Sequence, residues 1–495
     1  MENKEFWFVV GSQFLYGPEV LDTVAERAAE MAESMSASGK LPCKLVYKAT
    51  VKTDAEITEI MKAANRAEDC LGVVTWCHTF SPSKMWIHGL GLLQKPWCHL
   101  ATQYNRRIPN EAIDMDFMNL NQAAHGDREH GFIGARMRLP RKIIAGYWQD
   151  APVLEELGAW MRSAIGYDFS HKLRIVRFGD NMRDVAVTEG DKVEAQIKLG
   201  WTVDAYPVNE IAEYVAAVSQ ADTDALVDEY YNMYYILLDG RDEKEFRRHV
   251  AVQAQIELGF ERFMVEKDYH AIVTHFGDLG ALKQLPGLAI QRLEEKGYGF
   301  GAEGDWKTAG MVRVMKLMTA GMKDAKGTSM LEDYTYNLVP GKKGILQAHM
   351  LEVCPSMAEG RMAIRCLPLS MGDREDPARL VFTCKTGRGI ATSLIDLGTR
   401  FRLIINDVEC IKNEKPMPKL PVATNFWRPM PDFETGVEAW IYAGGAHHTA
   451  FTYDLTAEQM GDWAAAMGIE AVFIDKDTTI RSLKRDLMLG QVYYR

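Results

Sequence analysis

The sequence predicts an α/β protein with two Rossmann-like, parallel-sheet α/β domains followed by a mostly antiparallel, β-barrel-like C-terminal domain. Over the first third of the chain, apolar runs alternate with amphipathic stretches, and the same alternation restarts near residue 173. After residue 325 the sequence pattern changes to short apolar runs separated by proline and glycine. We therefore place the domains at residues 1–172, 173–325 and 326–495.

The first domain shows the alternation of strand and helix most clearly. Its strand-like runs are residues 6–10, 44–48 and 71–76, and its helical runs are residues 18–37, 54–67 and 82–93. Pro18 and Pro82 each fall near the start of a helical run, where a missing amide proton costs little. This rhythm is typical of strands joined by crossover helices in a parallel sheet.

The second and third domains are predicted from the same kinds of pattern. In the second we expect strands at residues 173–178, 203–208 and 271–275, and helices at residues 193–199, at 287–296 and within 210–266. In the third we expect strands at residues 346–353, 379–384, 390–397 and 401–408, and a small α/β tail from residue 456. Short strands of this kind predict an antiparallel sheet or barrel.

Composition excludes several classes of function. The chain has 495 residues, is 47% hydrophobic and carries a formal net charge of −11, with no basic run longer than a pair. Such a chain lacks the positive surface that nucleic acids and anionic membranes require, so we expect a small, neutral substrate. The N-terminus has no signal-peptide pattern, and no window approaches about 18 uninterrupted apolar residues, which predicts a cytoplasmic protein. The eight cysteines form no Cys-x-x-Cys pair and are expected to be thiols.

Four short polar islands hold the candidate metal ligands. They contain Glu303 with Asp305, Glu332 with Asp333, His349 with Glu352, and the pair His447 and His448. Two carboxylates and two imidazoles form a coherent ligand set for a divalent ion such as Mn2+, Co2+ or Mg2+. The same carboxylates could move protons. The islands therefore predict a metal-assisted enzyme.

The island around Glu303 also matches another motif. Residues 299–304 fit the Gly-x-Gly-x-x-Gly pattern of dinucleotide-binding turns, but the residues before them look helical, whereas that fingerprint requires a preceding strand. A phosphate loop is excluded because Trp306 stands where glycine is needed. We expect the glycines to expose Glu303 ahead of a helix at residues 306–322, with Asp305 as its N-cap. The alternative for Glu303 is a simple interaction with the helix dipole.

The alternation of side chains along a strand separates neighbouring candidates. An extended backbone would place Glu332, Tyr334 and Tyr336 on one side and Asp333 and Thr335 on the other, so only one of the adjacent acids can face a given cavity. A solvated acidic turn is the alternative for this island.

His349 is expected in a strand at residues 345–354, whose alternation would send Glu352 to the opposite face. His349 and Glu352 would then not form a two-ligand motif, and a buried, hydrogen-bonded histidine is the alternative. His447 and His448 follow small residues that permit close approach to a ligand, and their side chains should point apart. His125 lies in a polar stretch where it could hydrogen-bond a hydroxylated ligand.

Long runs of the chain resemble L-arabinose isomerase. They are residues 7–18, 78–86, 114–122, 178–183 and 304–308, and the resemblance covers nearly the whole chain. It implies a homohexamer and a Mn2+ site, with Co2+ or Mg2+ as substitutes, whose ligands map onto Glu303, Glu332, His349 and His448. His448 is chosen because the second histidine of the pair is the ligand in the family.

The resemblance also implies a set of sugar contacts. They map onto Gln13, Leu15, Met85, His125, Met182, Phe276 and Met371. Met371 stands where the family often has isoleucine, and Phe14 replaces a histidine found in some members. Family members form the site between protomers, so His125 would serve the metal of a neighbouring subunit.

The implied reaction is the conversion of L-arabinose to L-ribulose through an enediol, in L-arabinose catabolism, with Glu303 and Glu332 as the acid/base pair. A bound divalent ion would act as a Lewis acid on the sugar carbonyl. The nearest alternative is a relative of L-fucose isomerase with the same chemistry. A non-catalytic sugar-binding protein would explain the two α/β domains but not four metal-type ligands.

Overall fold

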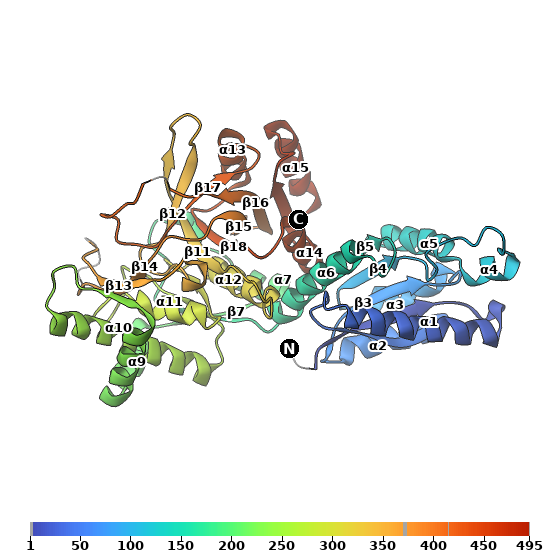
Figure 1. The fold of residues 1–495 in the computed structure, drawn as a ribbon, viewed down its shortest axis with the longest axis horizontal. Coiled ribbons are helices and arrows are strands. Elements are labelled where there is room, and N and C mark those ends of the chain that lie inside the picture. Colours follow the sequence, from blue (N-terminus) through green and yellow to red (C-terminus); the bar gives the residue numbers. More distant parts are fainter. Residues whose placement is uncertain (1–2, 370–373, 414, 495) are drawn as a thin grey trace. The chain divides into compact units, whose positions relative to one another are not determined.

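The computed structural model describes residues 3–369, 374–413 and 415–494 (Figure 1). The chain forms two compact units. Unit 1 consists of Met1–Asp168 with Gly461–Gly468, and unit 2 of Phe169–Met460 with Ile469–Arg495. The finer boundary near residue 325 stays a prediction. No helix among the described residues is both long enough and apolar enough to cross a membrane.

Unit 1 is built on a five-stranded parallel sheet with the order β2-β1-β3-β4-β5. Its strands are β1 (Glu5–Gly11), β2 (Lys44–Val51), β3 (Cys70–Cys77), β4 (Trp97–Ala101) and β5 (Lys142–Ala145). Its helices are α1 (Pro18–Ala37), α2 (Asp54–Arg66), α3 (Ile87–Leu92), α4 (Met115–Leu120), α5 (Ala123–Arg136) and α6 (Ala151–Ser170). Two short 3-10 turns, η1 (Phe14–Tyr16) and η2 (Ser83–Trp86), follow β1 and β3.

Both faces of this sheet are covered by helices. Alternate residues of β1 enter different cores: Phe6 and Phe8 pack with α1 and α6, whereas Trp7 and Val9 pack with α2 and α3. Every residue of β3 is buried. This two-sided burial is the reason that the strands read as continuous apolar runs rather than as alternating ones.

Unit 2 begins with a second parallel sheet, of the order β10-β9-β6-β7. Its strands are β6 (Arg174–Phe178), β7 (Thr202–Tyr206), β9 (Ala271–Val273) and β10 (Gly299–Gly301). The helices around it are α7 (Lys192–Leu199), α8 (Val208–Ala216), α9 (Gln220–Met233), α10 (Glu243–Lys267), α11 (Leu288–Glu295) and α12 (Trp306–Met318), with a 3-10 turn η3 (Ala186–Thr188). A small third sheet joins β8 (Tyr235–Leu237), β13 (Ala363–Cys366) and β14 (Ala378–Val381).

The later part of unit 2 is a closed antiparallel barrel. Six strands follow the order β15-β18-β11-β12-β17-β16, and pairing of β15 with β16 closes the ring. They are β11 (Thr328–Asn337), β12 (Gly344–Ala348), β15 (Gly387–Asp396), β16 (Phe401–Cys410), β17 (Thr424–Pro429) and β18 (His448–Thr452). The elements outside the barrel are η4 (Pro355–Met357), α13 (Phe433–Ala443), β19 (Glu470–Ile474) and α15 (Ile480–Tyr493). Helix α14 (Ala457–Met467) begins in unit 2, and its residues from Gly461 onward belong to unit 1.

The predicted fold class is therefore confirmed, whereas one predicted strand is too long and one short strand was not predicted. β12 ends at Ala348, so the expected strand through residue 353 is cut short, and residues 349–354 form a loop instead. The helix expected at residues 287–296 is confirmed as α11, but a strand that was not expected, β10, lies between this helix and the turn at Glu303. The strand is only three residues long and two of them are glycine, which hides it from a propensity argument.

Candidate active site

Glu303 stands in a sharp turn between β10 and α12. Its backbone is left-handed, with φ of 57°, and Gly304 follows with φ of 87°. A Cβ at Gly304 would lie 2.4 Å from the Cα of Asn181, so only glycine fits there. Asp305 then caps α12 by accepting a hydrogen bond from the backbone N–H of Thr308, as predicted. The turn therefore holds the Glu303 side chain at the carboxyl edge of the parallel sheet.

The other three predicted ligands come from neighbouring strands of the barrel. β11 lies between β12 and β18, and Glu332 on β11 pairs with His448 on one side and with Ala348 on the other. His349 follows Ala348 directly. The Oε2 atom of Glu332 is 3.9 Å from Nε2 of His349, and Oε2 of Glu303 is 3.7 Å from Nε2 of His448.

His448 is completely buried, and its two ring nitrogens have different surroundings. Nδ1 lies 3.2 Å from Oδ2 of Asp305, whose carboxylate accepts this hydrogen bond. Nε2 is buried without a hydrogen-bond partner among the described residues. With Nδ1 held by Asp305, the other ring nitrogen of His448, Nε2, is the one that faces Glu303.

Asp305 is itself held by a buried lysine. Burial acts to raise the pKa of the Asp305 carboxyl, but the Lys307 ammonium and the His448 hydrogen bond outweigh it and keep that pKa well below its usual range. The Nζ atom of Lys307 lies 3.4 Å from Asp305 and donates to the backbone carbonyls of Thr188 and Glu189. Asp305 thus orients His448 as a charged acceptor.

A carboxylate also holds His349, and it is that of Glu352, which the predicted alternation had placed on the opposite face. Nδ1 of His349 contacts the carboxylate of Glu352, which also accepts the backbone N–H of Leu351. The two side chains meet because β12 has already ended, so alternation no longer separates them. Burial acts to lower the pKa of His349, but Glu352 and Glu332 outweigh it and raise that pKa to about 9.

A cavity of about 210 Å³ adjoins these groups. Its wall contains Glu303, Glu332, His349 and Glu352, together with the predicted sugar contacts Met182 and Phe276 and the further residues Thr274, Leu279, Leu285, Pro286, Ala302, Tyr334 and Met350. The apolar part of this wall suits the carbon face of a small ligand, and the carboxylates suit its hydroxyls.

Tyr334 lines the same cavity as Glu332, on the side where it was expected, although the sequence assigned it no role. Tyr336 was expected on that side too, which is wrong. It lines a smaller cavity together with Asp333. The pairing of β11 with β12 shifts register between Asp333 and Thr335, and such an irregularity reverses the alternation beyond it. Glu332 and Asp333 do face different cavities, as predicted.

The residues present fit a divalent cation. One ligand atom each from Glu303, His447 and His448 lies within 4.8 Å of the others. A carboxylate with two imidazoles is a set that Mn2+ or Co2+ accepts, and the unpartnered Nε2 of His448 is the atom such an ion would engage. His447 is the more exposed of the pair, at 34% of its side chain, and its Nε2 lies 3.6 Å from Glu303.

The remaining predicted sugar contacts lie in unit 1. Gln13 follows β1, and Met85 is in η2 after β3, so both lie at the carboxyl ends of adjacent parallel strands. His125 is near the start of α5 and stacks on Phe80, with ring centroids 4.2 Å apart. Leu15 is 80% exposed. The structure does not bring these four into one unit with the carboxylates and histidines, and Met371 lies outside the described residues.

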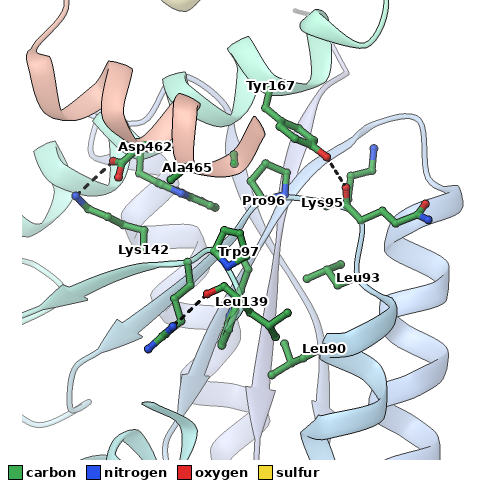
Figure 2. A pocket seen from close by; sticks show the side chains of 15 residues that line it. Leu90, Leu93, Lys95, Pro96, Trp97, Leu139, Lys142, Tyr167, Asp462 and Ala465 are labelled. Atoms are coloured by element: carbon green, nitrogen blue, oxygen red, sulfur yellow. Dashed lines mark hydrogen bonds and ion pairs between the residues drawn. The ribbon is translucent and has the colours of Figure 1, made fainter. Parts of the chain in front are cut away.

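A second cavity, of about 140 Å³, lies at the opposite edge of the unit 1 sheet, by the amino ends of β4 and β5 (Figure 2). Its floor is apolar, with Leu90, Trp97 and Leu139. Its lysines are paired: Lys142 lies 3.4 Å from Asp462, and Lys95 lies 3.7 Å from Asp168. It contains no predicted site residue.

Family models match the chain in order along its length. They describe the L-arabinose isomerase N-terminal domain at residues 1–172, the central domain at residues 174–321 and the C-terminal domain at residues 327–470. A curated L-arabinose isomerase from Geobacillus stearothermophilus is 52% identical over 491 residues, covering 99% of this chain and 98% of the relative. Another, from Thermotoga sp. (strain RQ2), is 51% identical over 494 residues, covering 100% and 98%. Similarity at this level extends through the barrel strands and the β10–α12 turn that carry the site, and the chain is thus an isomerase that belongs to the L-arabinose isomerase family.

Proposed function

We propose that this protein converts L-arabinose to L-ribulose in L-arabinose catabolism, as a divalent-metal-dependent aldose–ketose isomerase. The observation that carries the metal dependence is the buried Nε2 of His448, which has no partner among the described residues and lies 3.7 Å from the Glu303 carboxylate. The substrate is taken from the family, because its full-length relatives are named L-arabinose isomerase.

Glu303, Glu332, His349 and His448 would hold the ion, preferably Mn2+, with Co2+ or Mg2+ as substitutes. When bound, the ion supplies Lewis-acid polarisation of the sugar carbonyl and stabilises negative charge on the sugar oxygens. The other steps are tasks for the side chains of the chain itself.

Isomerisation moves a proton between C2 and C1 and another between O1 and O2. Glu303 and Glu332 both line the cavity, and we assign one to the carbon-bound proton and the other to the hydroxyl protons, with an enediol between the two half-reactions. Met182 and Phe276 would pack against the carbon face of the sugar and exclude water, which competes for the intermediate.

The unit 1 residues Gln13, Leu15, Met85 and His125 are proposed to bind sugar hydroxyls and carbons, with Met371 as a further contact. Because family members complete the site between protomers, we propose a homohexamer, in the cytoplasm, in which these residues serve a neighbouring subunit. Light scattering of the purified chain, combined with size-exclusion chromatography, measures the assembly directly.

One experiment tests substrate and metal together. The chain is stripped with a chelator and assayed on L-arabinose, D-galactose and L-fucose before and after Mn2+ is restored, while Mn2+ binding is measured separately by calorimetry. We expect no turnover without metal, recovery with Mn2+ and a preference for L-arabinose. Full activity in the stripped protein contradicts the metal dependence, and a preference for L-fucose contradicts the substrate.

A further inference from the structure

Unit 1 contains a buried cluster of histidines that the proposed function does not use. Thr75 on β3 lies at its centre, completely buried, with His99 of β4 and His130 of α5 beside it. The Oγ1 atom of Thr75 is 3.0 Å from Nδ1 of His99, 3.2 Å from Nε2 of His130 and 2.9 Å from the indole nitrogen of Trp97.

The outer ring nitrogens also have partners. Nε2 of His99 is 2.9 Å from Oδ1 of Asp127, and Nδ1 of His130 is 3.4 Å from Oγ of Ser83. The five side chains therefore form one continuous path, in the order Asp127, His99, Thr75, His130 and Ser83.

Counting donors and acceptors limits how this path can be protonated. A threonine hydroxyl offers one hydrogen and two lone pairs, and an indole N–H can only donate. Trp97 therefore occupies one lone pair of Thr75. The carbonyl of Cys98, 3.5 Å from Oγ1 of Thr75, is a more distant acceptor for the Thr75 hydrogen than either histidine. When that hydrogen goes to one histidine, the other histidine can donate to the remaining lone pair of Thr75, and both rings then have a partner.

Two arrangements satisfy this count. In the first, His99 is neutral and donates from Nε2–H to Asp127, so its Nδ1 accepts the hydrogen of Thr75. His130 then donates from Nε2–H to Thr75, and the Ser83 hydroxyl donates to Nδ1 of His130. If His99 is an imidazolium, Nδ1–H donates to Thr75, Thr75 donates to His130, and Nδ1–H of His130 donates to Ser83. The Ser83 hydroxyl then turns to the carbonyl of Ser81, 3.4 Å away.

We propose that these residues form a two-state hydrogen-bond relay, in which a proton taken up by His99 reverses every donor as far as Ser83. His130 changes tautomer in this relay without changing charge. Thr75 and His130 are positioning residues, since they act on the site through the elements that they join.

The geometry places the carboxylate of the relay next to His99 and not next to His130. Asp127 on α5 lies against His99 and is a ready counter-ion. On the other side, burial, followed by the positive charges of His99 and Arg141, holds the pKa of His130 well below its usual range. Glu129 of α5 accepts the backbone N–H of Ser83, at 3.3 Å, and leaves the Ser83 hydroxyl to the relay.

The relay connects two elements with proposed sugar contacts. Ser83 opens η2, which carries Met85, and His130 lies on α5, which carries His125. A change of donor at Ser83 alters how the first turn of η2 is held. This consequence rests on the proposed function, whereas the relay itself does not.

Neutron diffraction on crystals of the wild-type chain tests the relay, because it locates the exchangeable hydrogens. Data are collected at about pH 8 and about pH 5, the range over which histidine side chains change charge. We expect His130 to carry hydrogen on Nε2 alone at the higher pH and on Nδ1 alone at the lower pH, with His99 gaining a second hydrogen. A His130 ring that keeps one tautomer, or becomes doubly protonated, overturns the proposal.

Two variants of the central residue supply the matched comparison. Thr75→Ser keeps the hydroxyl, whereas Thr75→Val keeps the shape without it. Histidine-selective 15N spectra of the full chain should show a pH-dependent tautomer change in wild type and Thr75→Ser and none in Thr75→Val. With L-arabinose, Thr75→Val should raise KM more than it lowers kcat, and Thr75→Ser should restore KM. If wild type does not turn over L-arabinose, the proposed function fails while the spectra still decide the relay.

Discussion

Two clusters in this molecule contain buried histidines beside carboxylates, and they differ in how the ring nitrogens are paired. In unit 1, every ring nitrogen of His99 and His130 has a hydrogen-bond partner within the protein. In unit 2, Nδ1 of His448 is held by Asp305 while Nε2 is left without one among the described residues. A buried polar atom without a partner costs about 1–3 kcal/mol, and the metal ion that we propose for this site would supply the missing partner. In the unit 1 cluster every ring nitrogen is already paired, so a proton that enters it must rearrange the existing hydrogen bonds.

The largest effect is expected from the two carboxylates of the unit 2 cluster, Glu303 and Glu332. Glu303→Gln or Glu332→Gln should lower kcat/KM for L-arabinose by about 10²- to 10⁴-fold, because the amide can neither accept nor deliver the transferred proton. Steady-state kinetics measure this, and circular dichroism melts check the fold. Asp333→Asn is the matched control, since this neighbouring acid faces a different cavity, and it should keep most of its activity. Equal losses in all three variants contradict the assignment.

The support behind His448 should have the next largest effect. Asp305→Asn should weaken Mn2+ binding by about 10- to 100-fold, because the charged acceptor that orients the imidazole is lost. Asparagine is as good an N-cap as aspartate, so α12 should remain stable. Calorimetric titration with Mn2+ gives the affinity and a thermal melt gives the stability. An unchanged affinity shows that Asp305 serves only as a cap.

The pH dependence of metal binding tests the protonated state of His349. Its pKa of about 9 in the metal-free protein means that the ring carries a proton at neutral pH, and this proton must leave before Nε2 can bind an ion. Mn2+ affinity should therefore increase with pH, by up to about tenfold per unit, until about pH 9. Calorimetry in two buffers of different ionisation enthalpy counts the released proton.

The same shift predicts the stability of the metal-free chain. The pKa of His349 lies above the value of about 6.5 for an unfolded histidine, so its contribution to stability is complete below that pH and is lost as the pH rises through about 9. Glu352→Gln is the control, because removing the carboxylate should flatten both pH dependences. If Mn2+ affinity is constant between about pH 6 and pH 8, His349 is not protonated in the metal-free protein.

The smallest effect separates the two adjacent histidines. His447 is partly exposed and lies next to Glu303, whereas His448 is completely buried. We expect His447→Gln to reduce Mn2+ affinity by less than about tenfold and His448→Gln to reduce it much more. The reason is that His448 is the proposed metal ligand, whereas His447 would only lie beside the ion. Parallel titrations of the two variants make the comparison. The reverse order would assign the ligand to His447.

Much of this arrangement could be predicted from the sequence because it depends on periodicity. The alternation of apolar and amphipathic runs predicted the parallel sheets, and the helix expected at residues 18–37 is α1. The acids and histidines were found because polar residues are rare within apolar runs. The face of the strand on which each side chain lies was predicted from alternation, and this prediction was right for Glu332 and Asp333.

The errors came from places where periodicity stops. Glu352 was assigned to the wrong face because nothing in the apolar run at residues 345–354 marks the end of β12 at Ala348. Tyr336 was misplaced by a register shift that depends on the partner strand and not on local sequence. The relay around Thr75 was not predicted at all, since its members come from β3, β4, α5 and η2 and meet only in three dimensions.

The left-handed backbone at Glu303 has a consequence for engineering this enzyme. A glutamate in that conformation costs about 1 kcal/mol or more relative to glycine, which adopts it freely. A library selected for heat resistance alone would therefore tend to enrich glycine at residue 303 and lose the carboxylate with it. If Glu303 carries the proton that we propose, thermostable variants should be sought with activity scored in every round, because resistance to heat and turnover would favour different residues at this turn.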